Sequence, residues 1–175
     1  PAPPGGFVIA LRDTNGDGRA DRIERFGATK EDGVKGGDGI ALYKGSVYAE
    51  LDDRIVRYAL GSGALPRQPT ATILSGMPLT GDHPMHPFVI AGDGSLFVNM
   101  GSATNACDVK NRVPDGPGRR PCTELETRAG IWRYDAGKTD QRFSPAERYA
   151  TGIRNNGGIA FDRAGRVFGV QHGRD

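Results

Sequence analysis

The sequence predicts an all-β protein made of repeated four-stranded antiparallel sheets, and three observations support this fold class. One pattern, two apolar runs around a polar turn with Gly, occurs as GIALYKGSVYAE (39–50), PFVIAGDGSLFVN (87–99) and GIAFDRAGRVFGV (158–170). Short β-branched or aromatic runs bounded by Gly, Asp or Asn dominate the chain, which is typical of strands. No window has a convincing apolar period of 3.6 residues, as an amphipathic helix would require.

The repeat also indicates how the strands are organised. Two copies continue into RIVRY (54–58) and GIWRY (130–134), and each continuation is followed at the same distance by a Gly that ends another strand-like run. Four short strands in a unit of about 50 residues are the signature of β-propeller blades. A propeller brings the corresponding loops of its blades together at one end of its axis, so residues far apart in the sequence can share a site.

Each part of the chain is assigned to a blade in order. Residues 7–26 are predicted to supply the last two strands of one blade. Two fuller blades follow at 40–75 and 88–150, the second with an inserted loop at 102–127. Residues 159–170 are predicted to form the first two strands of a further blade. This amounts to about three blades, and a ring usually needs at least about four, so we expect a fragment of a larger propeller or a truncated one.

Composition excludes some functions. A content of 37% hydrophobic residues with 27 Gly and 12 Pro suits a turn-rich β protein. The net charge is only +2 and the basic residues are scattered, so nucleic-acid binding is not expected. No apolar run is long enough for a transmembrane helix, and the start at Pro1 resembles an interior cut or a mature end rather than a targeting segment.

Cys107 and Cys122 are the two cysteines of the chain and flank the polar segment 108–121. A disulfide closing this loop would suit a periplasmic or secreted protein. The alternative is a pair of free thiols in a cytosolic protein. Two thiolates fall short of the four ligands of a structural metal site.

A calcium-type loop follows the first predicted strand. It has oxygen-bearing residues at the spacing of a twelve-residue calcium loop and a Gly at its sixth position. The candidate ligands are Asp13, Asn15, Asp17, Arg19 through its backbone carbonyl, Asp21 and Glu24. Because the flanking segments read as strands, the alternative is a hairpin turn in which Asp, Asn and Gly suit the backbone geometry.

The blade layout places several polar loops at the end opposite this hairpin turn. They are the crossings between blades, GMPLTGDHPMHP (76–87) and GIRNNGG (152–158), together with the loops at 50–53, 100–129 and 171–175. A His next to a carboxylate is a candidate general base, and Arg is a candidate partner for a developing oxyanion. The candidates are His83 as base with Asp82 in support, His86 as the second choice of base, Arg154, Asn155 and His172. Each alone is more often an ordinary loop residue.

At these residues the sequence resembles a known family. The segments LTGDHPMHPFVI, GSATNAC, PCTELETRAGIWRYDA, FSPAERYATGIRN and FGVQHGRD are similar to the glucose/sorbosone dehydrogenase family of pyrroloquinoline quinone (PQQ) enzymes, and most similar to its L-sorbosone dehydrogenase-like members. The resemblance implies a six-bladed propeller, PQQ and Ca²⁺ as cofactors, and oxidation of a sugar or sugar-derived aldehyde. An external electron acceptor such as a cytochrome is also implied.

The resemblance also implies roles for individual residues. His83 corresponds best to the catalytic base, Arg154 to the arginine that stabilises charge on the quinone oxygen, and Asn155 to its cofactor-contacting neighbour. His172 stands where glucose dehydrogenases have Gln. Gly173 and Arg174 match the pair whose backbone carbonyls bind the active-site Ca²⁺, although the family has Pro where this chain has Arg174.

Two other functions remain open at this point. A Ca²⁺-dependent lactonase-like propeller would need several carboxylate or Asn ligands near the axis, whereas the loops named above offer mainly His, Arg and Asn. A non-catalytic binding propeller would need an aromatic or apolar patch at the same end, and these loops have few aromatic residues.

Overall fold

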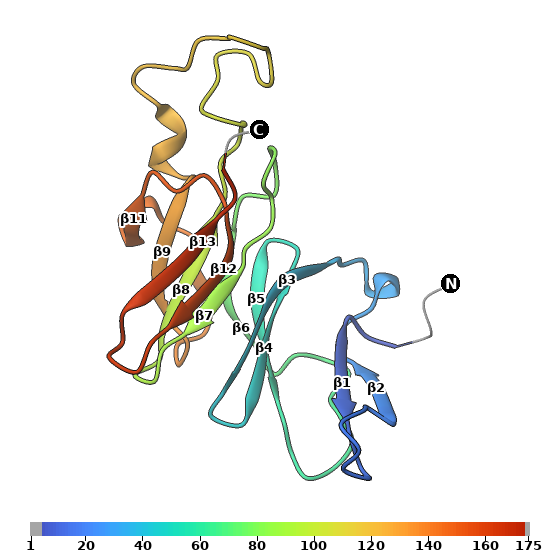
Figure 1. Ribbon diagram of the computed structural model, residues 1–175. Helices are drawn as coiled ribbons and strands as arrows, with labels where there is room; N and C mark the ends of the chain where they lie inside the picture. Colours follow the sequence, from blue (N-terminus) through green and yellow to red (C-terminus); the bar gives the residue numbers. More distant parts are fainter. Residues whose placement is uncertain (1–4, 174–175) are drawn as a thin grey trace.

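The first hairpin lies at one side of the molecule. The computed structural model describes residues 5–173 (Figure 1). β1 (Val8–Arg12) pairs antiparallel with β2 (Arg22–Phe26) as a two-stranded sheet. The exposed calcium-type loop joins the two strands and lies at the lower end in Figure 1, away from the C-terminal end of the chain.

The second sheet has five strands rather than the four expected. Its strands β3 (Gly36–Tyr43), β4 (Ser46–Leu51), β5 (Arg54–Ala59) and β6 (Ala71–Ser75) are antiparallel in chain order. The fifth strand, β10 (Gln141–Arg142), comes from the connection that leaves the next sheet, and it pairs parallel to β6. The side chain of Gln141 donates to the carbonyl oxygen of Ile73 (3.1 Å). The addition satisfies backbone groups of an edge strand that would otherwise lie exposed.

The third sheet has the expected four antiparallel strands. They are β7 (Phe88–Ile90), β8 (Ser95–Met100), β9 (Gly130–Asp135) and β11 (Arg148–Thr151), in the order β11-β9-β8-β7. Every residue of β8 is buried, as expected for a central strand covered on both faces. The inserted loop leaves β8 at the upper end in Figure 1 and returns to β9 through a short 3₁₀ turn, Thr123–Glu126.

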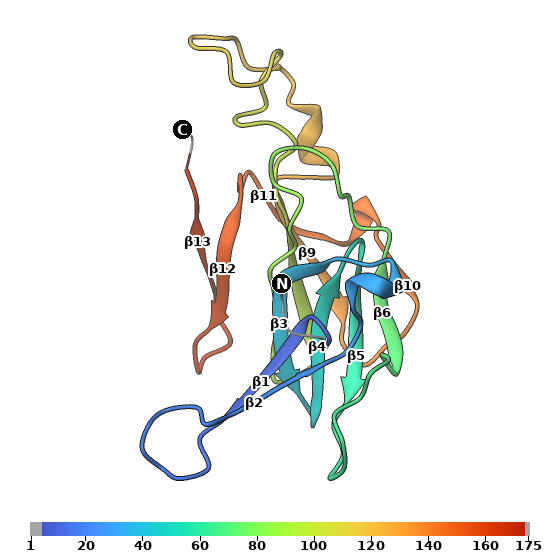
Figure 2. The ribbon, with the colours of Figure 1, turned by 90° about the vertical axis from the view of Figure 1, so that its right-hand side faces the viewer.

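A final hairpin lies beside the third sheet. β12 (Asn156–Phe161) pairs antiparallel with β13 (Val167–Gln171), and Figure 2 shows this pair standing next to the four-stranded sheet. Phe97 of β8 packs edge-on against Phe161 of β12, with ring centroids 5.4 Å apart.

Two hydrophobic clusters hold the sheets together. The larger joins the second and third sheets and includes Ile73, Leu96 and Trp132, each fully buried. The smaller joins the first hairpin to the second sheet around Tyr58, whose hydroxyl accepts a hydrogen bond from the backbone N–H of Ala28 (3.1 Å). The cores therefore lie between neighbouring sheets.

The all-β prediction is confirmed for the described residues, in which the other regular elements are three short 3₁₀ turns. Neighbouring sheets pack against each other through the two clusters. None of the sheets formed by the described residues closes into a barrel. Ring closure and the number of blades remain predictions. Within residues 5–173, no helix has the length and apolarity needed to cross a bilayer.

Candidate functional site

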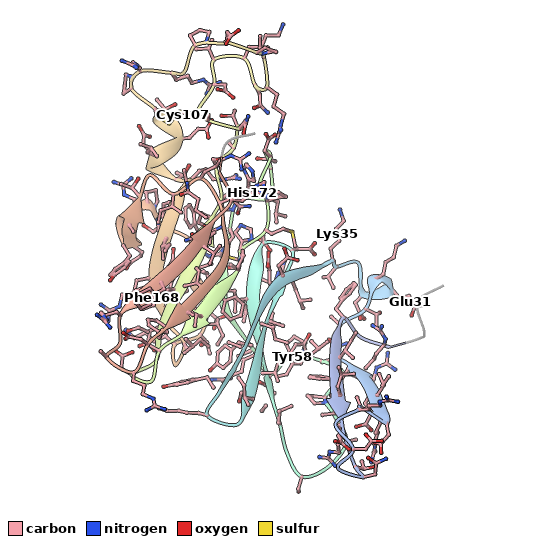
Figure 3. The ribbon with its side chains drawn as sticks, in the orientation of Figure 1. Glu31, Lys35, Tyr58, Cys107, Phe168 and His172 are labelled. Carbon is pink, nitrogen blue, oxygen red and sulfur yellow. A yellow bond between two sulfur atoms is a disulfide. The ribbon has the colours of Figure 1, made fainter. Side chains whose placement is uncertain are left out.

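Three segments far apart in the sequence meet at the upper end of the molecule in Figure 1. They are the first crossing (76–87), the inserted loop (102–127), and the second crossing (152–158) together with Gln171 at the end of β13 and the following His172. The backbone N–H of Ser102 donates to the carbonyl oxygen of Arg154 (2.7 Å), and that of His172 donates to the carbonyl oxygen of Asn155 (2.9 Å). In Figure 3, His172 lies at the same end as Cys107 of the inserted loop. We call this end the loop face.

His83 is held in one neutral form by Ser102. Its Nδ1 lies 3.0 Å from both the carbonyl oxygen and Oγ of Ser102, and Oγ donates its own hydrogen to the carbonyl oxygen of Thr104 (2.6 Å). Both Ser102 oxygens can therefore only accept, so Nδ1 carries the hydrogen. Within the described part of the chain, Nε2 has no hydrogen-bond partner and its lone pair is available.

The surroundings of His83 favour its neutral form. Burial lowers the pKa of His83 below 6.5, the bond to Ser102 opposes this shift, and the positive charge of Arg154 lowers the pKa further. The backbone is also fixed, because Arg128 donates to the carbonyl oxygens of His83 (3.2 Å) and Gly101 (2.6 Å). A Cβ on Gly101 would lie 2.4 Å from that of His83, so this contact requires Gly.

Arg154 is buried and bound to two segments. Its Nε donates to the carbonyl oxygen of Asn105 (2.6 Å) and its Nη2 donates to Oδ1 of the same residue (2.6 Å). Its Nη1 lies 3.2 Å from Nδ1 of His172. Since a guanidinium only donates, Nδ1 of His172 accepts and the hydrogen of this ring is on Nε2. Arg154 therefore ties the inserted loop to the end of β13.

Three asparagines, Asn99, Asn155 and Asn156, are connected by hydrogen bonds next to these groups. Asn99 of β8 donates from Nδ2 to Oδ1 of Asn155 (3.4 Å), and its own Oδ1 accepts from the backbone N–H of Asn156 (3.2 Å). Asn156 is buried, and its Nδ2 has no partner among the described residues. Asn155 is thus positioned from the central strand of the third sheet.

Neither Asp82 nor His86 forms a hydrogen bond with Nε2 of His83 among the described residues; both have other partners. The carboxylate of Asp82 accepts from Nδ2 of Asn111 and from Nε of Arg112, both at 2.9 Å, so it anchors the inserted loop. His86 is 1% exposed and both of its ring nitrogens have partners. The second choice of base therefore has no lone pair facing solvent, and the geometry favours His83.

The inserted loop is closed by a disulfide between Cys107 and Cys122. Inside it, the buried carboxylate of Glu124 accepts from the backbone N–H groups of Ala103 (2.8 Å) and Thr104 (3.1 Å). A cleft of about 260 Å³ lies between this loop and the second crossing. Its polar lining is Ser102, Asn105, Glu124, Arg154 and Gln171.

The calcium-type loop is organised by hydrogen bonds of its own. Asp13 accepts from the backbone N–H groups of Gly16 (2.7 Å) and Gly18 (2.8 Å), and Asp21 accepts from Thr14. Among the described residues, no three His, Cys, Asp or Glu side chains are grouped as metal ligands. The remaining candidates, Asn15, Asp17, Arg19 and Glu24, lie in this exposed hairpin, with Glu24 paired to Arg22 in β2.

Two predicted metal-binding residues follow β13. Gly173 is exposed and directly follows His172. Arg174 lies outside the described residues.

Sequence reasoning missed several residues of this region. Ser102, Asn105 and Arg128 orient the two main candidates, yet as single polar residues in the sequence they carry no signal of that role. Glu50 had a usable signal, since a carboxylate stands in the otherwise apolar strand segment SVYAEL. A charged residue in a buried strand is rare unless it is paired.

Comparisons with known proteins bear on the fold. No protein-family description and no curated protein matches the sequence. Among solved structures, the holo form of the pyranose dehydrogenase PQQ domain from Coprinopsis cinerea matches with a TM-score of 0.74 and 19% identity, over 98% of this chain and 40% of that chain.

Iodide and calcium structures of a Trichoderma reesei carbohydrate-active enzyme of family AA12 match with a TM-score of 0.71 and 18% and 19% identity. These alignments cover 95% of this chain and 40% of the other. At such low identity the likeness is one of fold. The chain therefore shares the fold of part of these enzymes and spans about 40% of their length.

Proposed function

We propose that the chain is part of a PQQ-dependent oxidoreductase that acts on a sugar or a sugar-derived aldehyde of the sorbosone or aldose type. The single observation that carries this proposal is His83, a neutral imidazole with a free Nε2, held beside Arg154 and Asn155 at one face. Support also comes from the fold shared with a PQQ domain of pyranose dehydrogenase and from the resemblance in the loop segments.

The residues present suit an anionic quinone. The cleft at the loop face is lined by Asn105 and by Arg154 with its guanidinium. The amide of Asn155 and the ring of His172, which lies 3.2 Å from Arg154, belong to the same loop face. In the proposal Arg154, Asn155 and His172 hold PQQ, and the backbone carbonyls of Gly173 and Arg174 hold Ca²⁺. When bound, PQQ with Ca²⁺ as Lewis acid supplies the acceptor for a hydride from the substrate carbon.

The chain's own contribution is proton transfer and orientation. Nε2 of His83 would take the proton of the substrate hydroxyl, and the hydride of the adjacent C–H bond would pass to bound PQQ, so that the alcohol or hydrate carbon would become a carbonyl carbon. Ser102 keeps Nδ1 protonated, so that Nε2 is the atom that accepts. The charge of Arg154 stabilises negative charge that develops at the face.

The lactonase-like alternative receives less support. Two carboxylates at the loop face are already bound within the protein, Asp82 by Arg112 and Glu124 by backbone N–H groups. We further propose a six-bladed ring for the whole protein, a periplasmic or secreted location in keeping with the disulfide, and an external electron acceptor such as a cytochrome.

Because the chain spans about 40% of the matching structures, we expect it to be inactive by itself. The experiment is therefore reconstitution of the full-length protein with PQQ and Ca²⁺, followed by dye reduction with aldoses and sorbosone. His83→Ala is expected to lower kcat by at least about a hundredfold, the usual size of a general-base contribution, while Lys138→Ala at an exposed turn has no effect. Absence of activity with every sugar, together with loss of quinone absorbance on desalting, would refute the proposal. Activity lost in His86→Ala but kept in His83→Ala would reassign the base.

A further inference from the structure

A buried carboxylate and imidazole join the first crossing to the second sheet. Oε1 of Glu50 in β4 accepts from Nδ1 of His86 and from the backbone N–H of the same residue, both at 2.9 Å. Nε2 of His86 lies 3.1 Å from the carbonyl oxygen of Pro78. The side chain of His86 is 1% exposed and that of Glu50 is 2% exposed. The ring of His86 therefore links Pro78, near the start of the first crossing, to Glu50 of β4, while His86 itself lies near the end of this crossing.

The partners of this ring determine its protons. A carbonyl oxygen only accepts, so Nε2 of His86 carries a hydrogen. Oε2 of Glu50 accepts from the backbone N–H groups of Asp38 (2.9 Å) and Gly39 (3.0 Å), which gives the carboxylate four N–H donors. Hydrogen bonds of this kind favour the ionised form, and a carboxylate requires a hydrogen on Nδ1. Both nitrogens are thus protonated, and His86 is an imidazolium.

The local charges agree with this assignment. Burial alone would raise the pKa of Glu50, but the hydrogen bonds and charge of His86 and the N–H of Gly39 outweigh it, so the pKa lies below its ordinary value. From β3 the facing groups are backbone amides, and the Asp38 side chain is exposed. On the crossing, Asp82 is paired with Arg112, and His83 is neutral.

The strand opposite the pair makes room for it. A Cβ on Gly37 would lie 2.2 Å from Cδ of Glu50, and a Cβ on Gly39 would lie 2.8 Å from the carbonyl oxygen of His86. Two glycines of β3 thus form a cradle for the carboxylate and for the backbone that carries His86. The site is therefore built from three segments, which are β3, β4 and the first crossing.

We propose that Glu50 and His86 are a positioning pair that holds the first crossing so that His83 meets Ser102. His83 is three residues from His86, and Pro84 and Pro87 restrict the backbone between and after them. Loss of either charge leaves the other buried and unpaired, and the crossing then detaches from β4. This role rests on the proposed function of His83, but the protonation pattern does not.

The first test is ¹⁵N nuclear magnetic resonance of the ring nitrogens in the full chain at pH 7. The chain has three histidines, and each is expected to show a different pattern: hydrogen on Nδ1 in His83, on both nitrogens in His86, and on Nε2 in His172. A neutral ring at His86 would overturn the proposal. This measurement uses the wild-type protein, so it decides the matter even where variants do not fold.

The second test compares Glu50→Gln with Asp38→Asn. Glu50→Gln removes the charge at nearly constant shape and should abolish both the imidazolium pattern of His86 and the Nδ1–H pattern of His83, with His172 unchanged. In the reconstituted enzyme it should lower kcat about tenfold to a hundredfold, as expected for a misplaced catalytic group, with little change in KM. Asp38→Asn keeps the backbone contact and should behave as wild type.

The outcomes separate the two proposals. If the wild type shows the three patterns but oxidises no sugar, the proposed function fails and the protonation assignment stands. If the wild type is active but Glu50→Gln keeps both the His83 pattern and kcat, the positioning role is overturned.

Discussion

The three histidines of the chain differ in what their ring nitrogens contact. Nδ1 of His83 faces two acceptors on Ser102, both nitrogens of His86 have acceptors, and Nδ1 of His172 faces a donor on Arg154. The same side chain is therefore a candidate base in His83, the proposed buried cation in His86, and a hydrogen-bond acceptor in His172. At the residue scale, the chemistry is determined by hydrogen-bond partners and not by residue type.

The pH dependence of the proposed activity follows from His83. Its pKa is lowered from 6.5, first by burial and then by the charge of Arg154, so the neutral, proton-accepting form persists below pH 6.5. We expect kcat/KM to fall only as the pH drops through this lowered pKa. The measurement is the pH profile of kcat/KM for the reconstituted enzyme.

A substitution at the neighbouring charge provides the control. Arg154→Gln removes the charge that disfavours protonated His83, so the pKa of His83, followed by nuclear magnetic resonance of its ring in the cofactor-free protein, should move up toward 6.5. An acid limb above pH 6.5 in the wild type would contradict the assignment of His83 as the base.

At the scale of elements, the inserted loop supplies several of the contacts that position the candidate site residues. Ser102 and Asn105 at its start bind His83 and Arg154, and Arg112 within the loop donates a hydrogen bond to Asp82 of the first crossing. The backbone N–H groups of Ala103 and Thr104, near the start of the loop, donate to the carboxylate of Glu124 near its end. The loop is thus folded back on itself next to the residues that orient His83 and Arg154.

Removal of the disulfide should loosen this loop. Cys107 and Cys122 are separated by 15 residues, and closing a loop of that length stabilises a protein by about 3 kcal/mol in the chain-entropy description. The double variant Cys107→Ser with Cys122→Ser should lower the free energy of unfolding by about 2–3 kcal/mol and weaken quinone binding through Asn105. Urea unfolding measures the first effect, with the exposed Val109→Ser as control, and equal stability of all three proteins would contradict the expectation.

At the scale of the whole molecule, the sheets are joined by apolar contacts between their faces. The hydroxyl of Tyr48 in the second sheet donates to the carbonyl oxygen of Ala136 (3.0 Å), just after β9 of the third. Around it, the larger cluster contains side chains of both sheets. The relative placement of the crossings, and hence of the loop face, depends on this interface.

A core substitution tests the importance of this interface. Ile73 is fully buried in the larger cluster, whereas Ile40 of β3 is 58% exposed. Ile73→Ala should lower the free energy of unfolding by about 2–5 kcal/mol, and Ile40→Ala by less than about 1 kcal/mol. Urea unfolding of the two variants checks this, and equal losses would show that the cluster does not hold the sheets together.

Much of this arrangement could be predicted because it is local. Strand identity follows from short β-branched runs bounded by Gly and Asp, and antiparallel order follows from short turns such as Lys44-Gly45. The repeat then placed His83, Arg154 and His172 at the same end, where the structure has them. The fifth strand of the second sheet was not predicted, because β10 has two residues and pairs with a strand from another repeat.

The sequence by itself determined the β class, the succession of sheets and the segments that carry the polar residues, since these depend on periodicity and turn chemistry within a few residues. Only the tertiary structure decided which partners the polar atoms have. Glu50 binds His86 across 36 residues and Arg154 binds Asn105 across 49. Such contacts depend on how sheets pack and on which donors meet which acceptors, and no local pattern in the chain encodes them.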